Sequence, residues 1–336
     1  MIEGKPKQGR MLSAVKRIGS AFKPVEYAGW EMLIMRAAFA VAIWYAFAKI
    51  QTFTEAPSPV GIAQWIDVSI FHDGDFRELS KWIVAACMLS YVFGVFPSVT
   101  LSIAAFLFVG AATLNTSQGK IHHHLQAGGG VLCILAIWHV IASIIHRFKP
   151  HHLTRLRTYQ LSVFFVLQAV AAAYVVSAVT KLDKSGLGWF TDAKYAPAAI
   201  RKTEDAAYFS TLEVRKPAAL QEDGASSEPA NDTVEDQAAD FFPRAVQKFL
   251  LDNPWAAGWV LGPGLILELF AFLALLGRRW ALAVGLLIIS FHFMVGHVMN
   301  LHFELNNHLL IIFFVNIPYW VLAFGRWITG MKKEAP

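Results

Sequence analysis

The feature that most constrains this chain is a series of long apolar stretches separated by short polar ones. A helix needs about 20 mostly apolar residues to cross the hydrocarbon core of a bilayer. Eight stretches approach that template: 30–53, 81–96, 97–114, 127–147, 160–181, 255–277, 280–300 and 307–328. The sequence therefore predicts an all-α integral membrane protein, a polytopic bundle of about eight transmembrane helices with one long extracytoplasmic loop.

The composition agrees with a membrane protein and argues against a soluble, a nucleic-acid-binding or a disulfide-stabilised protein. Hydrophobic residues make up 56% of the 336 residues and charged residues only 16%, whereas a soluble protein carries about 25% charged residues. The net charge of +5 is accounted for by basic loops, so no nucleic-acid partner is expected. The two cysteines lie in apolar stretches and predict buried thiols rather than a disulfide framework.

The placement of Lys and Arg predicts the orientation. Basic residues gather in 1–29, 146–157, 277–279 and 331–333, which the helix count puts on one side of the membrane. By the positive-inside rule that side is cytoplasmic. We expect a bacterial-type cytoplasmic (inner) membrane protein with both termini inside, in which 1–29 is a basic arm rather than a cleaved signal peptide.

The predicted organisation has five parts. They are the arm 1–29, transmembrane helices 1–5 over 30–181, an extracytoplasmic loop over 182–254, helices 6–8 over 255–328, and a cytoplasmic tail over 329–336. The middle of the loop, 216–240, is acidic and rich in Ala, Ser and Pro, which predicts disorder. Its flanks, 194–214 and 240–255, predict short amphipathic helices at the interface, and the loop is a candidate docking segment for an extracytoplasmic protein partner.

Ionisable residues inside spans are expensive and are therefore functional or paired. Arg36 and Glu268 fall at comparable predicted depths and are expected to form a structural ion pair, with a direct chemical role as the alternative. His139 and His292 fall near mid-membrane, which would suit axial haem ligands. A lone buried histidine is more often a packing residue, so no haem is assigned.

The predicted topology also brings polar residues to the outer face, where Lys181 ends the fifth helix. The other members of this set are His122, His123, His124, His297, Asn300, His302 and His308. The position of Lys181 allows two interpretations: a lysine that extends into headgroup water or a functional group. The spacings of these histidines are poor for chelation from one helix face, so no metal is assigned.

Several segments resemble the membrane part of the vitamin K-dependent γ-glutamyl carboxylases and their bacterial HTTM (horizontally transferred transmembrane) relatives. "YVVSAVTKLDKSGLGWF" (174–190) is similar to the family's Y-x-x-x-G-x-x-K-L-x-x-x-W segment, with Ser177 or Ala178 in place of its glycine. Further similar pieces follow in the family's order: Arg36, "LNTSQGKIHHHLQ", "LILELFAFLALLGRR" and "FHFMVGHVMNLHFELNNHLLIIFFVNIPYW".

The resemblance implies a role for Lys181. In the family, a lysine at this point deprotonates reduced vitamin K, oxygen adds, and the resulting strong base prepares a glutamate for carboxylation. The resemblance thus implies a membrane enzyme that uses a reduced lipid quinone, with Lys181 and His297 as catalytic residues. It implies a quinone-binding set of His123, His124, Trp189, His292, Asn300, His302 and His308.

The family's large extracytoplasmic β domain has no counterpart in these 336 residues, so quinol-linked oxygen chemistry is expected rather than peptide carboxylation. A base role would require desolvation, because a lysine in water has a pKa of about 10.4 and stays protonated at neutral pH. Two other functions remain open: a non-catalytic subunit or anchor of a larger complex, and a haem or quinone electron-transfer subunit. Membrane lipid and a lipid quinone are the expected small partners.

Overall fold

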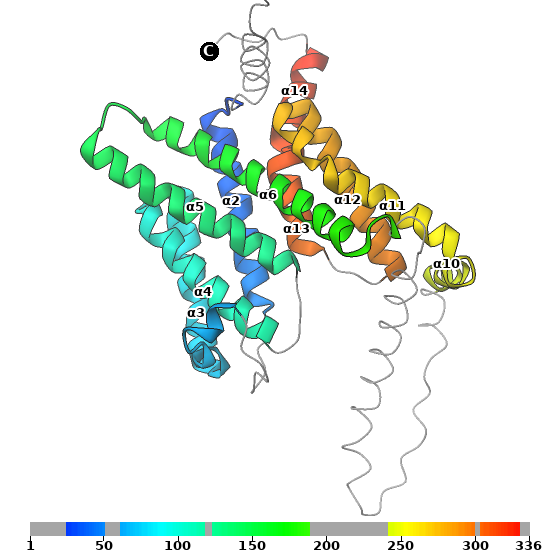
Figure 1. The fold of residues 1–336 in the computed structure, drawn as a ribbon. Helices are drawn as coiled ribbons and strands as arrows, with labels where there is room; N and C mark the ends of the chain where they lie inside the picture. The colour runs from blue at the N-terminus through cyan, green and yellow to red at the C-terminus, as the bar shows by residue number, and fades with distance from the viewer. Residues whose placement is uncertain (1–24, 51–60, 118–122, 189–240, 300–302, 330–336) are drawn as a thin grey trace, which may run out of the picture. The chain divides into compact units, whose positions relative to one another are not determined.

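The computed structural model describes residues 25–50, 61–117, 123–188, 241–299 and 303–329, and within these ranges every regular element is helical (Figure 1). They form two compact units. The first comprises the described parts of Met1–Tyr174, Ala271–Leu286 and Glu304–Pro336, and the second those of Val175–Phe270 and Leu287–Phe303. Most of the loop 182–254, including the predicted disordered segment 216–240 and the predicted helix 194–214, lies outside the described residues.

The first unit is built on consecutive helices. They are α2 (Gly29–Ala48), α3 (Gly74–Phe93), α4 (Pro97–Ser117), α5 (His123–Phe148) and the first part of α6 (Arg155–Ser185). Along the chain α2 packs against α3, α3 against α4 and α4 against α5, and α13 (Glu304–Leu309) packs on α5 and α2 (Figure 1). A π-helical stretch (Leu310–Val315) and α14 (Ile317–Thr329) complete this unit together with the start of α12 (Arg278–Met299).

The two ends of α3 show why the sequence folds this way locally. Asp73 caps the start of α3 by accepting a hydrogen bond from the backbone N–H of Phe76 at 2.8 Å, which satisfies a donor that the helix leaves unpaired. The helix ends at Gly94, whose φ of 70° is left-handed. A Cβ there would lie 2.4 Å from the Tyr159 hydroxyl and 2.5 Å from Arg155 Nη2. The left-handed conformation therefore favours glycine, and a larger residue would also have to displace the ends of these two side chains.

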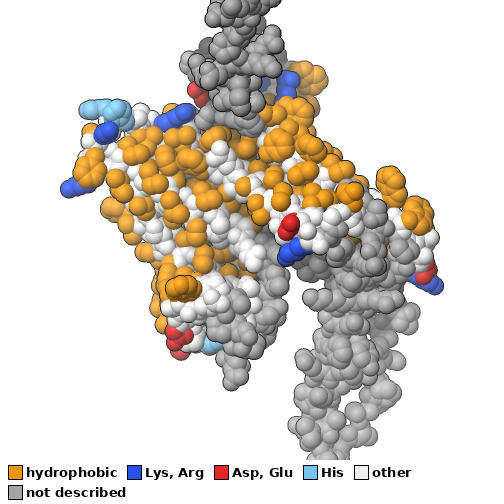
Figure 2. All heavy atoms as spheres, viewed as in Figure 1, with side chains coloured by type: hydrophobic (Ala, Val, Ile, Leu, Met, Phe, Trp, Pro, Cys, Tyr) orange, Lys and Arg blue, Asp and Glu red, His pale blue; other side chains and the backbone are white. Residues whose placement is uncertain are grey.

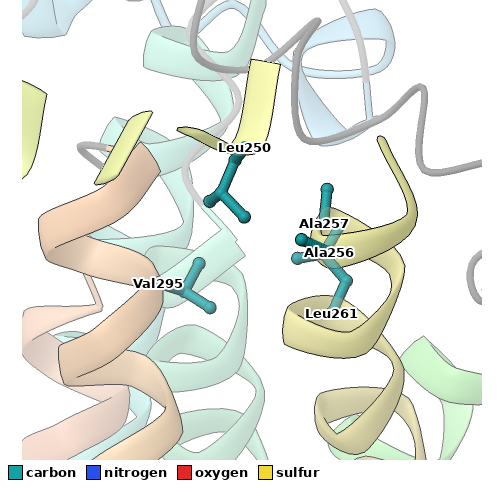
Figure 3. Packing of buried hydrophobic residues seen from close by; sticks show 5 residues of the cluster. All are labelled: Leu250, Ala256, Ala257, Leu261 and Val295. Carbon is teal, nitrogen blue, oxygen red and sulfur yellow. The ribbon is translucent and has the colours of Figure 1, made fainter. Parts of the chain in front are cut away.

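The second unit packs α10 (Phe241–Asp252) and α11 (Pro254–Leu269) against the later part of α12. Its core contains Leu250 of α10, Ala256, Ala257 and Leu261 of α11, and Val295 of α12 (Figure 3). Gly264 allows α11 and α12 to approach closely, because a Cβ at this position would lie 1.9 Å from the Phe291 ring. The predicted interfacial helix over 240–255 is thus helical over 241–252.

Six helices among the described residues are long and apolar enough to cross a membrane, as expected of a multi-pass membrane protein. They run over Gly29–Ala48, Pro97–Ser117, Leu125–Phe148, Arg155–Lys184, Arg278–His297 and Glu304–Thr329. These correspond to six of the eight predicted spans.

The other two predicted spans, 81–96 and 255–277, do not meet that standard. The first two turns of α3 contain Asp75, Arg77, Glu78 and Lys81, so the apolar part of this helix begins only at Trp82 and is shorter than the usual length of about 20 residues. In the second case α11 has 16 residues, or about 24 Å at 1.5 Å per residue, against a hydrocarbon core of about 30 Å. After Phe270 the chain continues as a 3₁₀ helix over Ala271–Leu276.

Candidate functional site

Lys181 and Glu268 form an ion pair inside the second unit. The Lys181 ammonium contacts both carboxylate oxygens of Glu268, at 2.7 Å to Oε1 and 2.6 Å to Oε2. Lys181 lies one turn before the end of α6, and Glu268 is the residue before the last of α11. The lysine side chain is 29% exposed and the glutamate side chain only 10%. The pair is therefore partly desolvated, and part of the Lys181 side chain stays accessible from outside the protein.

This geometry changes two sequence predictions. Lys181 does not end its helix, since α6 continues to Ser185, and its ammonium is directed to a carboxylate instead of only to headgroup water. Glu268 was expected two turns inside a span and opposite Arg36. Because α11 stops at Leu269, Glu268 lies at a helix end, where Lys181 is its partner.

Arg36 has different surroundings in the first unit. Its guanidinium lies over the Tyr159 ring, 4.1 Å from the centroid, and it donates to the carbonyl oxygens of Met32 and Tyr91, each at 3.4 Å. Aromatic faces and carbonyl oxygens both stabilise a guanidinium away from water. The structure thus gives both members of the predicted Arg36–Glu268 pair a partner other than the one expected.

The predicted catalytic His297 also lies in the second unit, on α12. Its exposed ring packs on Phe293 of the same helix, with ring centroids 4.1 Å apart, and Nδ1 lies 2.9 Å from the Phe293 carbonyl oxygen. A carbonyl oxygen can only accept, so Nδ1 carries the proton and Nε2 is left as the basic nitrogen. One turn earlier, His292 is buried and stacks on Phe303 at 4.2 Å with the rings nearly parallel.

The remaining members of the predicted quinone-binding set are distributed as follows. His308 belongs to the first unit, on α13, and its ring meets the Tyr45 ring edge-on at 6.4 Å. His123 and His124 begin α5, but their side chains lie outside the described residues, as do Trp189, Asn300 and His302 entirely. The predicted convergence of these residues with Lys181 stays a prediction.

His139, considered above as a haem ligand, takes part in a polar cluster of the first unit. Its Nε2 lies 3.2 Å from the Ser162 hydroxyl, and its ring packs between Tyr91 and Tyr159. These contacts satisfy the buried ring as a packing residue. Among the described residues, no three His, Cys, Asp or Glu side chains are grouped as metal ligands would be.

A second buried ion pair, between Arg278 and Glu31, was missed by the sequence reasoning. Arg278 contacts both carboxylate oxygens of Glu31 and donates to the Glu26 carbonyl oxygen at 2.7 Å. Its guanidinium lies between the rings of Tyr27 and Tyr319, at 4.5 and 3.9 Å from their centroids. The signal was present in the sequence, because Glu31 is the only acidic residue of the first apolar stretch.

Asn316 completes this network at the end of the π-helical stretch. Its amide nitrogen donates to Glu31 Oε1, and its backbone is left-handed, with φ of 50°. Its Oδ1 is buried and accepts no hydrogen bond within the described part of the chain. Asparagine is, after glycine, a usual left-handed residue at a helix end, and the Asn316 backbone N–H caps the stretch by donating to the Ile311 carbonyl oxygen at 2.9 Å.

Comparisons of this chain with protein-family models, with curated proteins and with solved structures found no match.

Proposed function

We propose that this chain is a multi-pass membrane enzyme of the vitamin K-dependent carboxylase type, in which the Lys181–Glu268 pair removes a proton from a reduced lipid quinone. The pair is the single observation that carries the proposal. It joins the lysine of the segment that resembles the carboxylases to a carboxylate with only 10% of its side chain exposed. We further propose a bacterial-type cytoplasmic membrane with both termini inside. If α3 and α11 cross it in addition to the six long apolar helices, as in the eight-span prediction, Lys181 lies near the outer face.

The pair can act as a base although an ion-paired lysine is an ammonium. A proton moves within the pair from Lys181 Nζ to a Glu268 oxygen 2.6–2.7 Å away, which leaves a neutral amine and a carboxylic acid. The quinol O–H bond then breaks, its electron pair stays on the quinol oxygen, and the proton forms a new N–H bond on Lys181. The net change is one proton gained by Glu268, so the proton belongs to the pair as a unit.

The later steps follow the resemblance alone. One oxygen molecule and one quinol give one quinone epoxide and one water, and the strongly basic intermediate on that path deprotonates an acceptor. We propose that His297, through Nε2, assists in this proton transfer, and that His292 and the residues predicted with it contact the quinone ring.

The test is oxygen uptake by the purified protein in lipid nanodiscs with a reduced naphthoquinone. Lys181→Ala, Lys181→Arg and Glu268→Gln should each lower the rate by about 10²–10⁴-fold, the usual contribution of a general base. Lys181→Arg is the decisive variant, because arginine keeps the charge and the pairing but does not release its proton. Wild-type rates in Lys181→Arg, or no quinol-dependent uptake by the wild type, would overturn the proposal.

A non-catalytic membrane subunit is the second candidate, favoured by the apolar surface beside α10. Phe249 on α10 and Trp255 at the start of α11 are exposed, while Leu250 is buried in the unit's core. In this case deleting 216–240 would abolish co-purification with a partner, and Lys181→Arg would leave co-purification unchanged.

A further inference from the structure

The end of the first unit where α5 joins α6 is strongly basic and has no acidic residue near it in sequence. Arg147, Lys149, Arg155 and Arg157 fall within eleven positions, and no Asp or Glu lies between Glu78 and Asp183. Figure 2 shows Lys, Arg and His side chains gathered at this turn, beside a surface of hydrophobic side chains over α5. The turn therefore lacks an acidic partner from its own region of the chain.

These basic residues differ in what they contact. Arg155 donates to the Gly94 carbonyl oxygen at 3.1 Å, and Arg157 lies 3.5 Å from the Gln160 side-chain oxygen. Arg147 is exposed and forms no ion pair or hydrogen bond with any residue that the structure describes. The Arg147 guanidinium is thus available to an external anion.

Arg147 also lines an open groove of about 500 Å³ between the start of α4 and the end of α5. The apolar lining comes from both helices: Val99 and Ile103 of α4, and Val140, Ile144 and Phe148 of α5. Ser102 and Ser143 also line it, and their hydroxyls donate to carbonyl oxygens of their own helices at 2.7 and 2.8 Å. The groove volume falls in the range of small-molecule sites, about 300–1,000 Å³.

We propose that this groove is a binding site for one anionic phospholipid, with an acyl chain along the α4–α5 groove and the phosphate on Arg147. Charge complementarity carries the choice of occupant. An apolar groove on a membrane-spanning helix pair accepts an acyl chain, and an arginine at its end with no partner in the described residues selects a headgroup with net negative charge. Basic pockets between transmembrane helices bind anionic headgroups in this way. The proposal holds whether or not Lys181 performs chemistry.

The experiment measures lipid retention by native mass spectrometry of the full chain in detergent, with phosphatidylglycerol and phosphatidylcholine of identical acyl chains as probes. The wild type should retain phosphatidylglycerol in preference to phosphatidylcholine. Arg147→Gln should weaken phosphatidylglycerol binding about fivefold, the effect of one basic residue at an anionic headgroup, and leave phosphatidylcholine unchanged. Ser143→Phe, which fills the groove without changing its charge, should weaken both lipids.

Arg326→Gln is the matched control, because Arg326 is also an exposed arginine in the last turn of a membrane-spanning helix of the same unit and lies outside the groove. Melting temperatures in lipid-free detergent establish that each variant folds. Equal retention of the two lipids by the wild type would overturn the proposal. So would an equal loss in Arg326→Gln and Arg147→Gln, or unchanged binding in a folded Ser143→Phe protein.

Discussion

Replacing Glu31 by glutamine should destabilise the first unit strongly, because it removes the only carboxylate that balances Arg278 in the network described above. Glu31 accepts from the Ala28 backbone N–H, from both terminal nitrogens of Arg278 and from Asn316. Glutamine offers a single acceptor oxygen, and its NH₂ group would face these donors. Leaving one member of a buried ion pair unpaired costs about 3–5 kcal/mol, and the arginine side chain is only 17% exposed.

The assay is unfolding in mixed detergent micelles, from which the free energy of unfolding is obtained for each variant. Glu31→Gln should lose about 3–5 kcal/mol, whereas the double variant Glu31→Met/Arg278→Met should lose much less, since it removes both charges. Lys49→Met is the control at an exposed pair, in which Lys49 contacts Glu304 at 2.9 Å with both side chains half exposed. An equal, small effect of Glu31→Gln and Lys49→Met would refute the reasoning.

Three further predictions concern local structure. Gly264→Ala should lower the free energy of unfolding by about 1–3 kcal/mol, through overpacking against the Phe291 ring. Gly130→Ala, where a Cβ meets nothing within 4 Å, should instead stabilise α5 by about 0.5–1 kcal/mol; a reversed order in chemical denaturation would contradict both. Asp73→Ala should lower the free energy of unfolding by about 1 kcal/mol, because it removes the cap of α3. Asp73→Asn should retain most of the stabilisation that the cap provides. The hydrogen bonds from the Ser69 hydroxyl and backbone N–H lower the pKa of Asp67. The stability that these bonds give the folded protein is therefore present above the ordinary aspartate pKa and is lost as pH falls through the lowered value. A carbon-detected NMR titration should place the Asp67 midpoint higher in Ser69→Ala, and an unshifted midpoint would refute that cause.

Spans were predictable from sequence where apolar length alone decides them. Six spans appear as predicted because hydrophobic length is a local property. The other two spans, 81–96 and 255–277, stay unconfirmed, each for its own reason. The charged first turns of α3 shorten its apolar part, and α11 changes to a 3₁₀ helix after Phe270.

Partners within the site were less predictable than its residues. Lys181, Glu268 and Arg36 were all singled out as ionisable groups in apolar surroundings, but Glu268 was assigned to Arg36 from predicted depth. Depth along a helix says nothing of which helices are neighbours, and the end of α11 at Leu269 changed the depth itself. The Glu31–Arg278–Asn316 network was missed for a related reason, because Arg278 was interpreted only as a topology signal. The helix-end pattern of Asn316 followed by Pro318 indicates where the chain turns, but not which residues the asparagine side chain contacts.

The most direct test of the central claim is a double-mutant cycle on quinol-dependent oxygen uptake with Lys181→Arg and Glu268→Gln. If the pair acts as one base, each single variant removes most of the rate, and the double variant is no slower than the slower single one, since groups that act as a unit are not additive. Losses that multiply in the double variant, or a Lys181→Arg protein as fast as the wild type, would contradict the account.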